Sequence, residues 1–225
     1  MIHHRPPHDI LVDYATGALA QPLAMAVATH AELCPESLAE IADIEAVGGV
    51  MLASLEPVKM SENALDRVMA LVGEMDNRIP DTEIDAGPDI SMRDEIRKSA
   101  LPPAIRATLD GKTDTIAWQR RGPVIESTVL DCDLDNYEVR LFRIKAGKTV
   151  PQHTHEGLEI TVCLTGGYTD GRDRYARGDF QVADPMVNHQ PVADNDEHCI
   201  VLTVFEKDIR LTSPLGRLIN PFVRL

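Results

Sequence analysis

The sequence has no long hydrophobic segment. Its uncharged apolar runs, such as the seven residues Cys199–Phe205, are short, whereas a helix that crosses a bilayer needs about 20. The N-terminus also lacks a basic stretch that leads into an apolar core and a small-residue cleavage site, so it does not resemble a secretory signal. We therefore expect no membrane contact and a cytoplasmic location.

Cysteines are few and have no repeated spacing; they stand at positions 34, 132, 163 and 199. In a reducing compartment, this pattern favours buried thiols, metal ligands or redox sites over disulfides. We assign no role to Cys132.

Positive charge is scarce, and the deficit is uneven. The chain has 22 Lys and Arg against 36 Asp and Glu, a net charge of -14, and residues 1–85 alone carry 4 basic and 15 acidic residues, or -11. Such a segment would repel phosphates, which excludes direct binding of nucleic acid and favours a basic protein partner. The alternative is that the acidic residues only keep a helical module soluble.

The 225 residues change character between residues 74 and 112. Before this stretch, apolar residues recur at helical spacing and predict four helices, the last of them short. Acidic residues, prolines and glycines in the stretch itself are typical of a linker. We expect an α+β, multidomain chain with a helical domain at 1–85, a linker at 86–112 and a β domain at 113–225.

After residue 112 the apolar period changes to two, and turn residues recur at short intervals. Many short strands that close one core indicate a small antiparallel barrel or jelly roll. The predicted strands are Val124–Leu130, Tyr137–Ile144, Leu158–Leu164, Phe180–Val182 and Cys199–Phe205. In the third of these, alternation places the aliphatic side chains on one face and Glu159, Thr161 and Cys163 on the other.

The strongest chemical signal is a set of metal-ligand residues in the second half. His153 and His155 share one face of an extended strand, Glu159 follows four residues later, and His189 comes after the Gly178 turn. Three imidazoles and one carboxylate suit a divalent metal, and these ligands alone do not choose among zinc, iron, manganese, nickel and copper. We take zinc as the first choice. The alternative is a set of surface histidines, or a barrel that keeps its motif without metal.

This spacing resembles the first metal-binding motif of the cupin family, which runs here from Gly147 to Gly166. The second motif is looser, because Asp184 and Met186 stand where cupins often have proline and glycine. Among cupins, three histidines and one glutamate occur in dioxygenases and in enzymes that cleave carbon–carbon bonds. A metal-dependent cupin enzyme is therefore the alternative function; Tyr168, Asp170 and Arg172 would line its pocket.

The first half resembles the ChrR family of zinc-binding anti-sigma factors, which join a helical anti-sigma domain to a C-terminal cupin. Three segments carry the resemblance: His3–Leu19, Val27–Ser37 and Ala46–Gly49. The family holds zinc through an N-terminal histidine and a His-x3-Cys-x2-Cys motif. The resemblance implies that His4 is the N-terminal ligand here, with His3 and His8 as rivals, and that His30 and Cys34 are the ligands of the motif. Ser37 replaces the last cysteine of the motif, so this zinc site should be weakened, completed by another group, or absent.

The same resemblance implies a partner and a mode of regulation. The partner would be an extracytoplasmic-function sigma factor, whose basic faces suit the acidic helical domain. We expect the last helix to supply apolar anchors, namely Leu65, Val68, Met69 and Leu71, unless this stripe packs within the chain. The cupin would control release under oxidative stress such as singlet oxygen, with Cys163 or Cys199 as an oxidisable element or as inert buried thiols. A third interpretation is that the cupin serves only as a homodimer platform.

Overall fold

The structure is a computed structural model that describes residues 2–76, 101–108, 118–130, 137–206 and 209–212. Its described helices are α1 (His8–Ala15), α2 (Gln21–Ala31), α3 (Pro35–Ala53), α4 (Ala64–Asp76) and α6 (Pro103–Thr108). Prolines stand in the first turns of α2 and α3, where their missing N–H groups have no helical partner to lose. Within the described residues, no helix is long and apolar enough to span a membrane.

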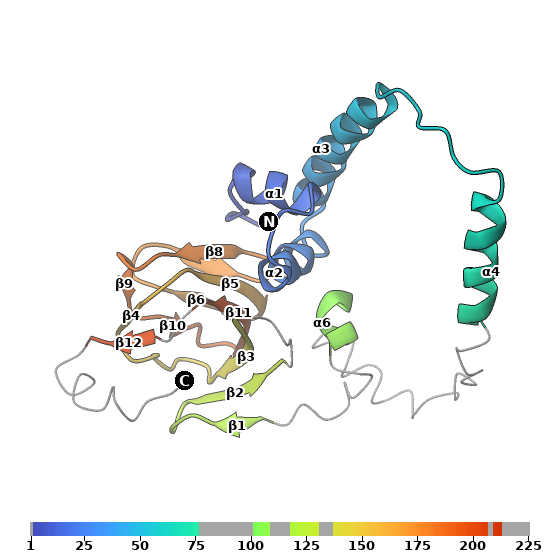
Figure 1. Ribbon diagram of the computed structural model, residues 1–225. Coiled ribbons are helices and arrows are strands. Elements are labelled where there is room, and N and C mark those ends of the chain that lie inside the picture. Colours follow the sequence, from blue (N-terminus) through green and yellow to red (C-terminus); the bar gives the residue numbers. More distant parts are fainter. Residues whose placement is uncertain (1, 77–100, 109–117, 131–136, 207–208, 213–225) are drawn as a thin grey trace.

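The strands form a β domain of three antiparallel sheets (Figure 1). The largest sheet has the order β1-β2-β3-β11-β5-β8, and the others have the orders β10-β6-β7 and β12-β4-β9. The strands are β1 (Gln119–Arg120), β2 (Ile125–Val129), β3 (Glu138–Ile144), β4 (His153–His155), β5 (Glu159–Thr165), β6 (Gly167–Thr169), β7 (Arg174–Ala176), β8 (Phe180–Ala183), β9 (Asn188–His189), β10 (Val192–Ala193), β11 (Cys199–Phe205) and β12 (Ile209–Leu211).

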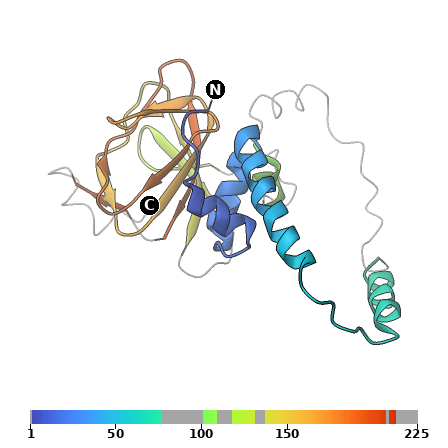
Figure 2. The same cartoon turned by 90° about the horizontal axis from the view of Figure 1, so that it is seen from above.

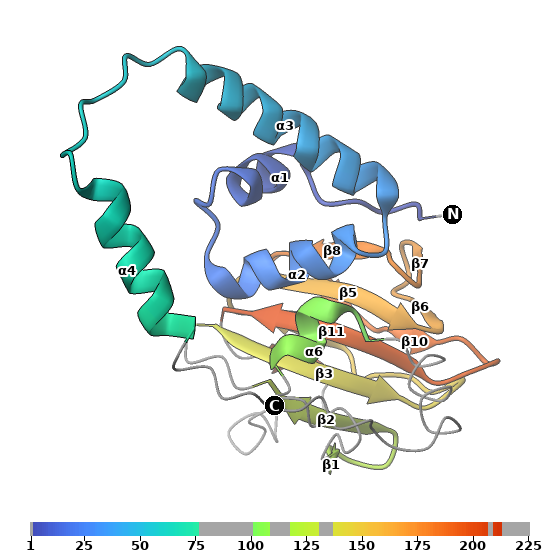
Figure 3. The same ribbon diagram turned by 90° about the vertical axis from the view of Figure 1, so that its right-hand side faces the viewer.

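Helices and sheet share one hydrophobic core. Helix α2 lies across β5 and β11, with α6 beside it, while α1 and α3 cover α2 from the other side (Figure 3). Buried Val27 of α2 and Ile105 of α6 belong to the same cluster as Ile160 and Leu202 of the sheet. The first three helices are therefore anchored on the outer face of the β domain.

Helix α4 stands apart from the other helices and from the sheet (Figures 1 and 2). We predicted a short last helix here, whereas α4 has 13 residues and α1 has eight. The apolar side chains of its first three turns are exposed. The stripe predicted at Leu65, Val68, Met69 and Leu71 therefore does not pack within the described chain.

The five predicted strands are confirmed as β2, β3, β5, β8 and β11. The alternation predicted for β5 is confirmed as well: its aliphatic side chains lie in the core beneath α2, while Glu159 and Thr161 face the interior of the β domain. The predicted linker at 86–112 includes the short helix α6, and its residues 86–100 and 109–112 lie outside the described chain.

Candidate metal centre

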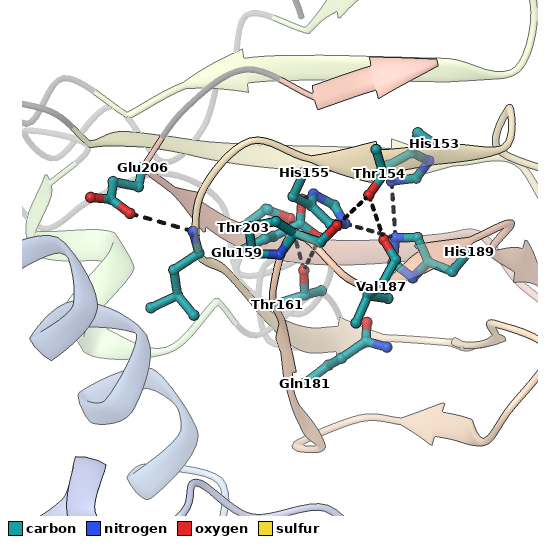
Figure 4. A network of polar contacts seen from close by, with 12 residues as sticks. His153, Thr154, His155, Glu159, Thr161, Gln181, Val187, His189, Thr203 and Glu206 are labelled. Carbon is teal, nitrogen blue, oxygen red and sulfur yellow. Dashed lines mark hydrogen bonds and ion pairs between the residues drawn. The ribbon is translucent and has the colours of Figure 1, made fainter. Parts of the chain in front are cut away.

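Three histidines converge inside the β domain, from strands that pair with each other. His153 and His155 lie on β4, and His189 lies opposite His153 on the neighbouring strand β9. Residues two apart on a strand point to the same side, so β4 directs both of its imidazoles inward. All three rings are buried, and within the described residues they form the one group of three or more candidate ligands that lies within metal-binding distance (Figure 4).

The ring nitrogens meet at the spacing that one metal ion requires. His189 Nε2 lies 3.0 Å from His153 Nε2 and 3.2 Å from His155 Nε2. Two nitrogens bound to one ion at about 2.0–2.1 Å are about 3.3 Å apart at a tetrahedral angle and about 2.9 Å apart at a right angle. The observed separations fall within this range, so the three histidines fit a bound metal.

Hydrogen bonding prepares one of these rings for metal. His153 Nδ1 lies 2.8 Å from the carbonyl oxygen of Pro151 and donates its proton there. The lone pair is therefore left on Nε2, the atom that faces the other histidines. Burial lowers the pKa of His153, and it lowers that of His189 to about 4. The His153 and His189 rings stay neutral near pH 7, as metal ligands must.

Glu159, the fourth predicted ligand, lies beside this group rather than within it. Its Oε2 is 3.2 Å from Nδ1 of His155, the ring atom that points away from the Nε2 cluster, and its Oε1 accepts a hydrogen bond from Thr161. Burial alone would raise the pKa of Glu159, but the adjacent His155 ring, and after it His153 and His189, lower it overall. The carboxylate is thus ionised and available either to a metal or to the His155 ring.

A second carboxylate supports the site from behind. Asp170 Oδ2 lies 3.8 Å from His189 Nδ1 and accepts a 2.6 Å hydrogen bond from the Gln181 side chain, which in turn accepts one from the Tyr168 hydroxyl. We predicted Tyr168, Asp170 and Arg172 around a pocket; Tyr168 lines it, Asp170 is buried behind it, and Arg172 is exposed. Sequence reasoning missed Gln181, because nothing in the sequence of β8 indicates that this amide would bridge Asp170 and Tyr168.

His153 and His189 border a cavity of about 90 Å³ inside the β domain. Its wall is largely apolar, with Ile125, Phe142 and Val201 among its residues, and its polar part includes His153, Glu159 and His189. A metal held at one polar wall of an apolar cavity can bind a small molecule at an open coordination position.

The thiols named as oxidisable candidates are free and buried. Cys163 and Cys199 share a cluster on the inner side of the sheet. A hydrogen bond with Cys199 and burial together raise the pKa of Cys163 far above its usual range, which makes it a poor nucleophile. Cys132 lies outside the described residues.

The helical residues expected to bind zinc do not form a ligand group of this kind. His30 Nε2 lies 2.8 Å from the Ser37 hydroxyl, the Cys34 thiol lies 3.5 Å from the Glu36 carboxylate, and the His4 ring packs against Tyr175 with ring centroids 4.5 Å apart. The rival His8 pairs with Glu40 at 2.8 Å.

Known proteins resemble the chain over its whole length. Residues 107–207 match the family model for the ChrR cupin-like domain. The anti-sigma-E factor ChrR of Cereibacter sphaeroides is 32% identical over 224 residues, which cover 100% of this chain and 99% of that protein. A crystal structure of Rhodobacter sphaeroides SigE in complex with the anti-sigma ChrR matches with a TM-score of 0.73 and 30% identity, covering 91% of this chain and 99% of that one. The chain belongs to the ChrR family of anti-sigma factors.

Proposed function

We propose that this chain sequesters an extracytoplasmic-function sigma factor through its N-terminal helices, and that its cupin regulates the release. The proposal rests on membership of the ChrR family and on the similarity to a ChrR chain whose crystal structure is described as a complex with SigE. A sigma factor held in this way is kept from RNA polymerase. In this proposal the helical domain is residues 1–85, the linker 86–112 and the cupin 113–225.

One surface feature supports this proposal above all. Large apolar side chains are exposed along the C-terminal half of α3, through the following segment and along α4. Each of them is at least half exposed; they are Val47, Val50, Met51, Leu52, Leu55, Val58, Met60, Leu65, Val68, Met69, Leu71 and Val72. We call this set the α3–α4 surface. Extended apolar surfaces of this kind mark protein-interaction sites.

The partner that this surface fits is a basic protein with an apolar groove. Helix α4 is amphipathic and stands free of the rest of the fold, which suits a helix that docks in a groove of another protein. The net charge of -11 on residues 1–85 attracts a basic partner at long range and speeds the encounter. Sequence reasoning identified Leu65, Val68, Met69 and Leu71 but not the α3 part of the surface.

The cupin is the regulatory part of the proposal. His153, His155 and His189 would hold a divalent metal, with Glu159 as fourth ligand or as the partner that orients the His155 ring. Such a metal offers Lewis acidity or redox chemistry at the wall of the cavity. We take zinc as the first choice, with iron, manganese or nickel as alternatives, and oxidative stress such as singlet oxygen as the class of signal.

The test is capture of the partner by the full chain. Tagged full-length protein is incubated with lysate of its native host under reducing conditions, and the captured proteins are identified by mass. A sigma factor bound by the unmodified chain, lost with L65A/V68A/M69A/L71A and kept by the control V129A/V182A/M186A, would support the proposal. The control removes exposed apolar side chains of the cupin instead. A sigma factor captured equally by all three proteins, or by none, would contradict it.

The cavity favours a second candidate, a metal-dependent cupin enzyme of the dioxygenase or carbon–carbon bond-cleaving type. Its polar wall carries two metal-ligand histidines, and a small substrate could reach a metal held there. This candidate predicts consumption of dioxygen or of a small organic substrate by the metal-loaded chain. It gives no role to the α3–α4 surface, so turnover that survives L65A/V68A/M69A/L71A in a chain that captures no sigma factor would favour it.

A further inference from the structure

His30, at the C-terminal end of α2, is the most completely enclosed of the histidines. Its ring is 0% exposed and lies edge-on to Phe180 of β8, with ring centroids 5.6 Å apart. It therefore lies at the junction between the helices and the cupin sheet, and each of its polar atoms needs a partner inside the protein.

Both ring nitrogens of His30 have a hydrogen-bond partner inside the protein. Nδ1 is 2.7 Å from the carbonyl oxygen of Gly178, and Nε2 is 2.8 Å from the hydroxyl of Ser37. A carbonyl oxygen only accepts, so Nδ1 carries the proton, and Nε2 accepts the hydrogen bond that Ser37 donates. The ring is neutral and its hydrogen-bonding capacity is used up.

The remaining donors of the family's zinc motif are engaged elsewhere. Cys34 is 1% exposed, and its thiol faces the carboxylate of Glu36. The His4 ring lies against Tyr175, while the backbone on either side of it is fixed by Asp179 and Phe180. Ser37 itself offers a hydroxyl, which does not ionise near pH 7 as a zinc-binding thiolate does. These residues do not fit a zinc ion.

The contacts that replace zinc also tie the helices to the cupin. Gly178 and Asp179 belong to the turn between β7 and β8: Gly178 accepts from His30, and one oxygen of Asp179 accepts from the backbone N–H groups of His3 and His4. Gly178 has a φ of 94°, and a side chain there would collide with Ile2. The turn is thus shaped to receive both the N-terminal segment and α2.

We infer that His30, Ser37 and Gly178 form a metal-free clasp that takes the place of the family's helical zinc site and joins α2 and α3 to the cupin. The anti-sigma helices then keep their arrangement when zinc is removed. This inference goes beyond the proposed function and does not depend on which partner the helices bind.

Zinc K-edge X-ray absorption of the zinc-loaded full chain tests the clasp directly. The cupin ligands are nitrogen and oxygen atoms, so sulfur at about 2.3 Å from zinc would come from a helical site. We expect no sulfur shell in the unmodified chain. Ser37→Cys should restore the thiolate pair of the motif and produce such a shell, and adding Cys34→Ala should remove it again.

A sulfur shell in the unmodified chain that Cys34→Ala abolishes would overturn the inference. Absence of the shell from S37C as well would also overturn it, because serine at position 37 would then not be what excludes zinc. A sulfur shell in the unmodified chain can be tested with the unmodified chain and C34A alone. The inference therefore stays open to refutation even if S37C fails to fold. Neither result depends on sigma-factor binding, so the clasp and the proposed function can fail separately.

Discussion

Truncating the apolar stripe of α4 should abolish partner binding while leaving the fold intact. In the variant L65A/V68A/M69A/L71A, the four side chains removed are 56–67% exposed in the free protein. They therefore contribute little to folding, and alanine favours helix at least as well as the residues it replaces. We expect each truncation to change the free energy of unfolding by less than about 0.5 kcal/mol.

The binding loss follows from the area still to be buried. Complete burial of such a side chain contributes roughly 1.5–3 kcal/mol, so burying the exposed part, somewhat more than half, contributes about 1–2 kcal/mol each. The four together contribute about 4–8 kcal/mol, equivalent to a rise in Kd of about 1,000-fold or more. Because α4 has 13 residues and stands alone, docking also supplies the tertiary packing that so short a helix lacks in water.

The assay is calorimetric titration of the captured sigma factor with the full-length variant, alongside urea unfolding of the free protein. The control V129A/V182A/M186A should bind as the unmodified chain does. A Kd within tenfold of the unmodified value would refute the assignment of the stripe. So would a loss of several kcal/mol in unfolding free energy, because it would show that the stripe packs inside the molecule.

Three further results are expected. Changing His153 and Glu159 together to Ala should lower the metal content of the cupin from about one ion per chain to near zero, measured by elemental analysis, and should leave sigma-factor affinity intact; retained metal would contradict the site. Ser37→Ala should lower the free energy of unfolding by about 1–3 kcal/mol in urea, because it leaves Nε2 of buried His30 without its donor; a change under about 0.5 kcal/mol would contradict the clasp. Burial lowers the pKa of His30 below its ordinary value of 6.5, so the unfolded chain binds more protons than the folded chain below that pH. The unfolding free energy should therefore fall as the pH drops from about 6.5. In His30→Gln this fall should be shallower, and equal slopes in the two proteins would refute the argument.

The cupin half could be predicted in detail because its signals are local. Alternation from Leu158 to Leu164 shows which face of β5 is buried beneath α2, and the spacing of His153 and His155 places both rings on one side of β4. The convergence of His189 on this pair follows from pairing of β4 with β9, which the family motif implies but the spacing alone does not.

The helical half could be predicted as far as the existence of its helices and the apolar stripe of α4, but not how its helices pack. Whether an apolar stripe is buried depends on what lies beside it, and nothing in the sequence distinguishes exposed Leu65 of α4 from buried Leu23 of α2. The partners of His30 depend in the same way on tertiary packing, since Gly178 is 148 residues away. The substitution at Ser37 indicated a weak zinc site, but not that the hydroxyl would satisfy the same imidazole.

Transcription in a reconstituted system tests the central claim most directly. The captured sigma factor, core RNA polymerase and a promoter that the sigma factor recognises are combined with increasing amounts of the full-length chain. Sequestration predicts that transcription falls to background near one chain per sigma factor, and that L65A/V68A/M69A/L71A restores it at the same concentration. Transcription that continues unchanged at a tenfold excess of the unmodified chain would contradict the account.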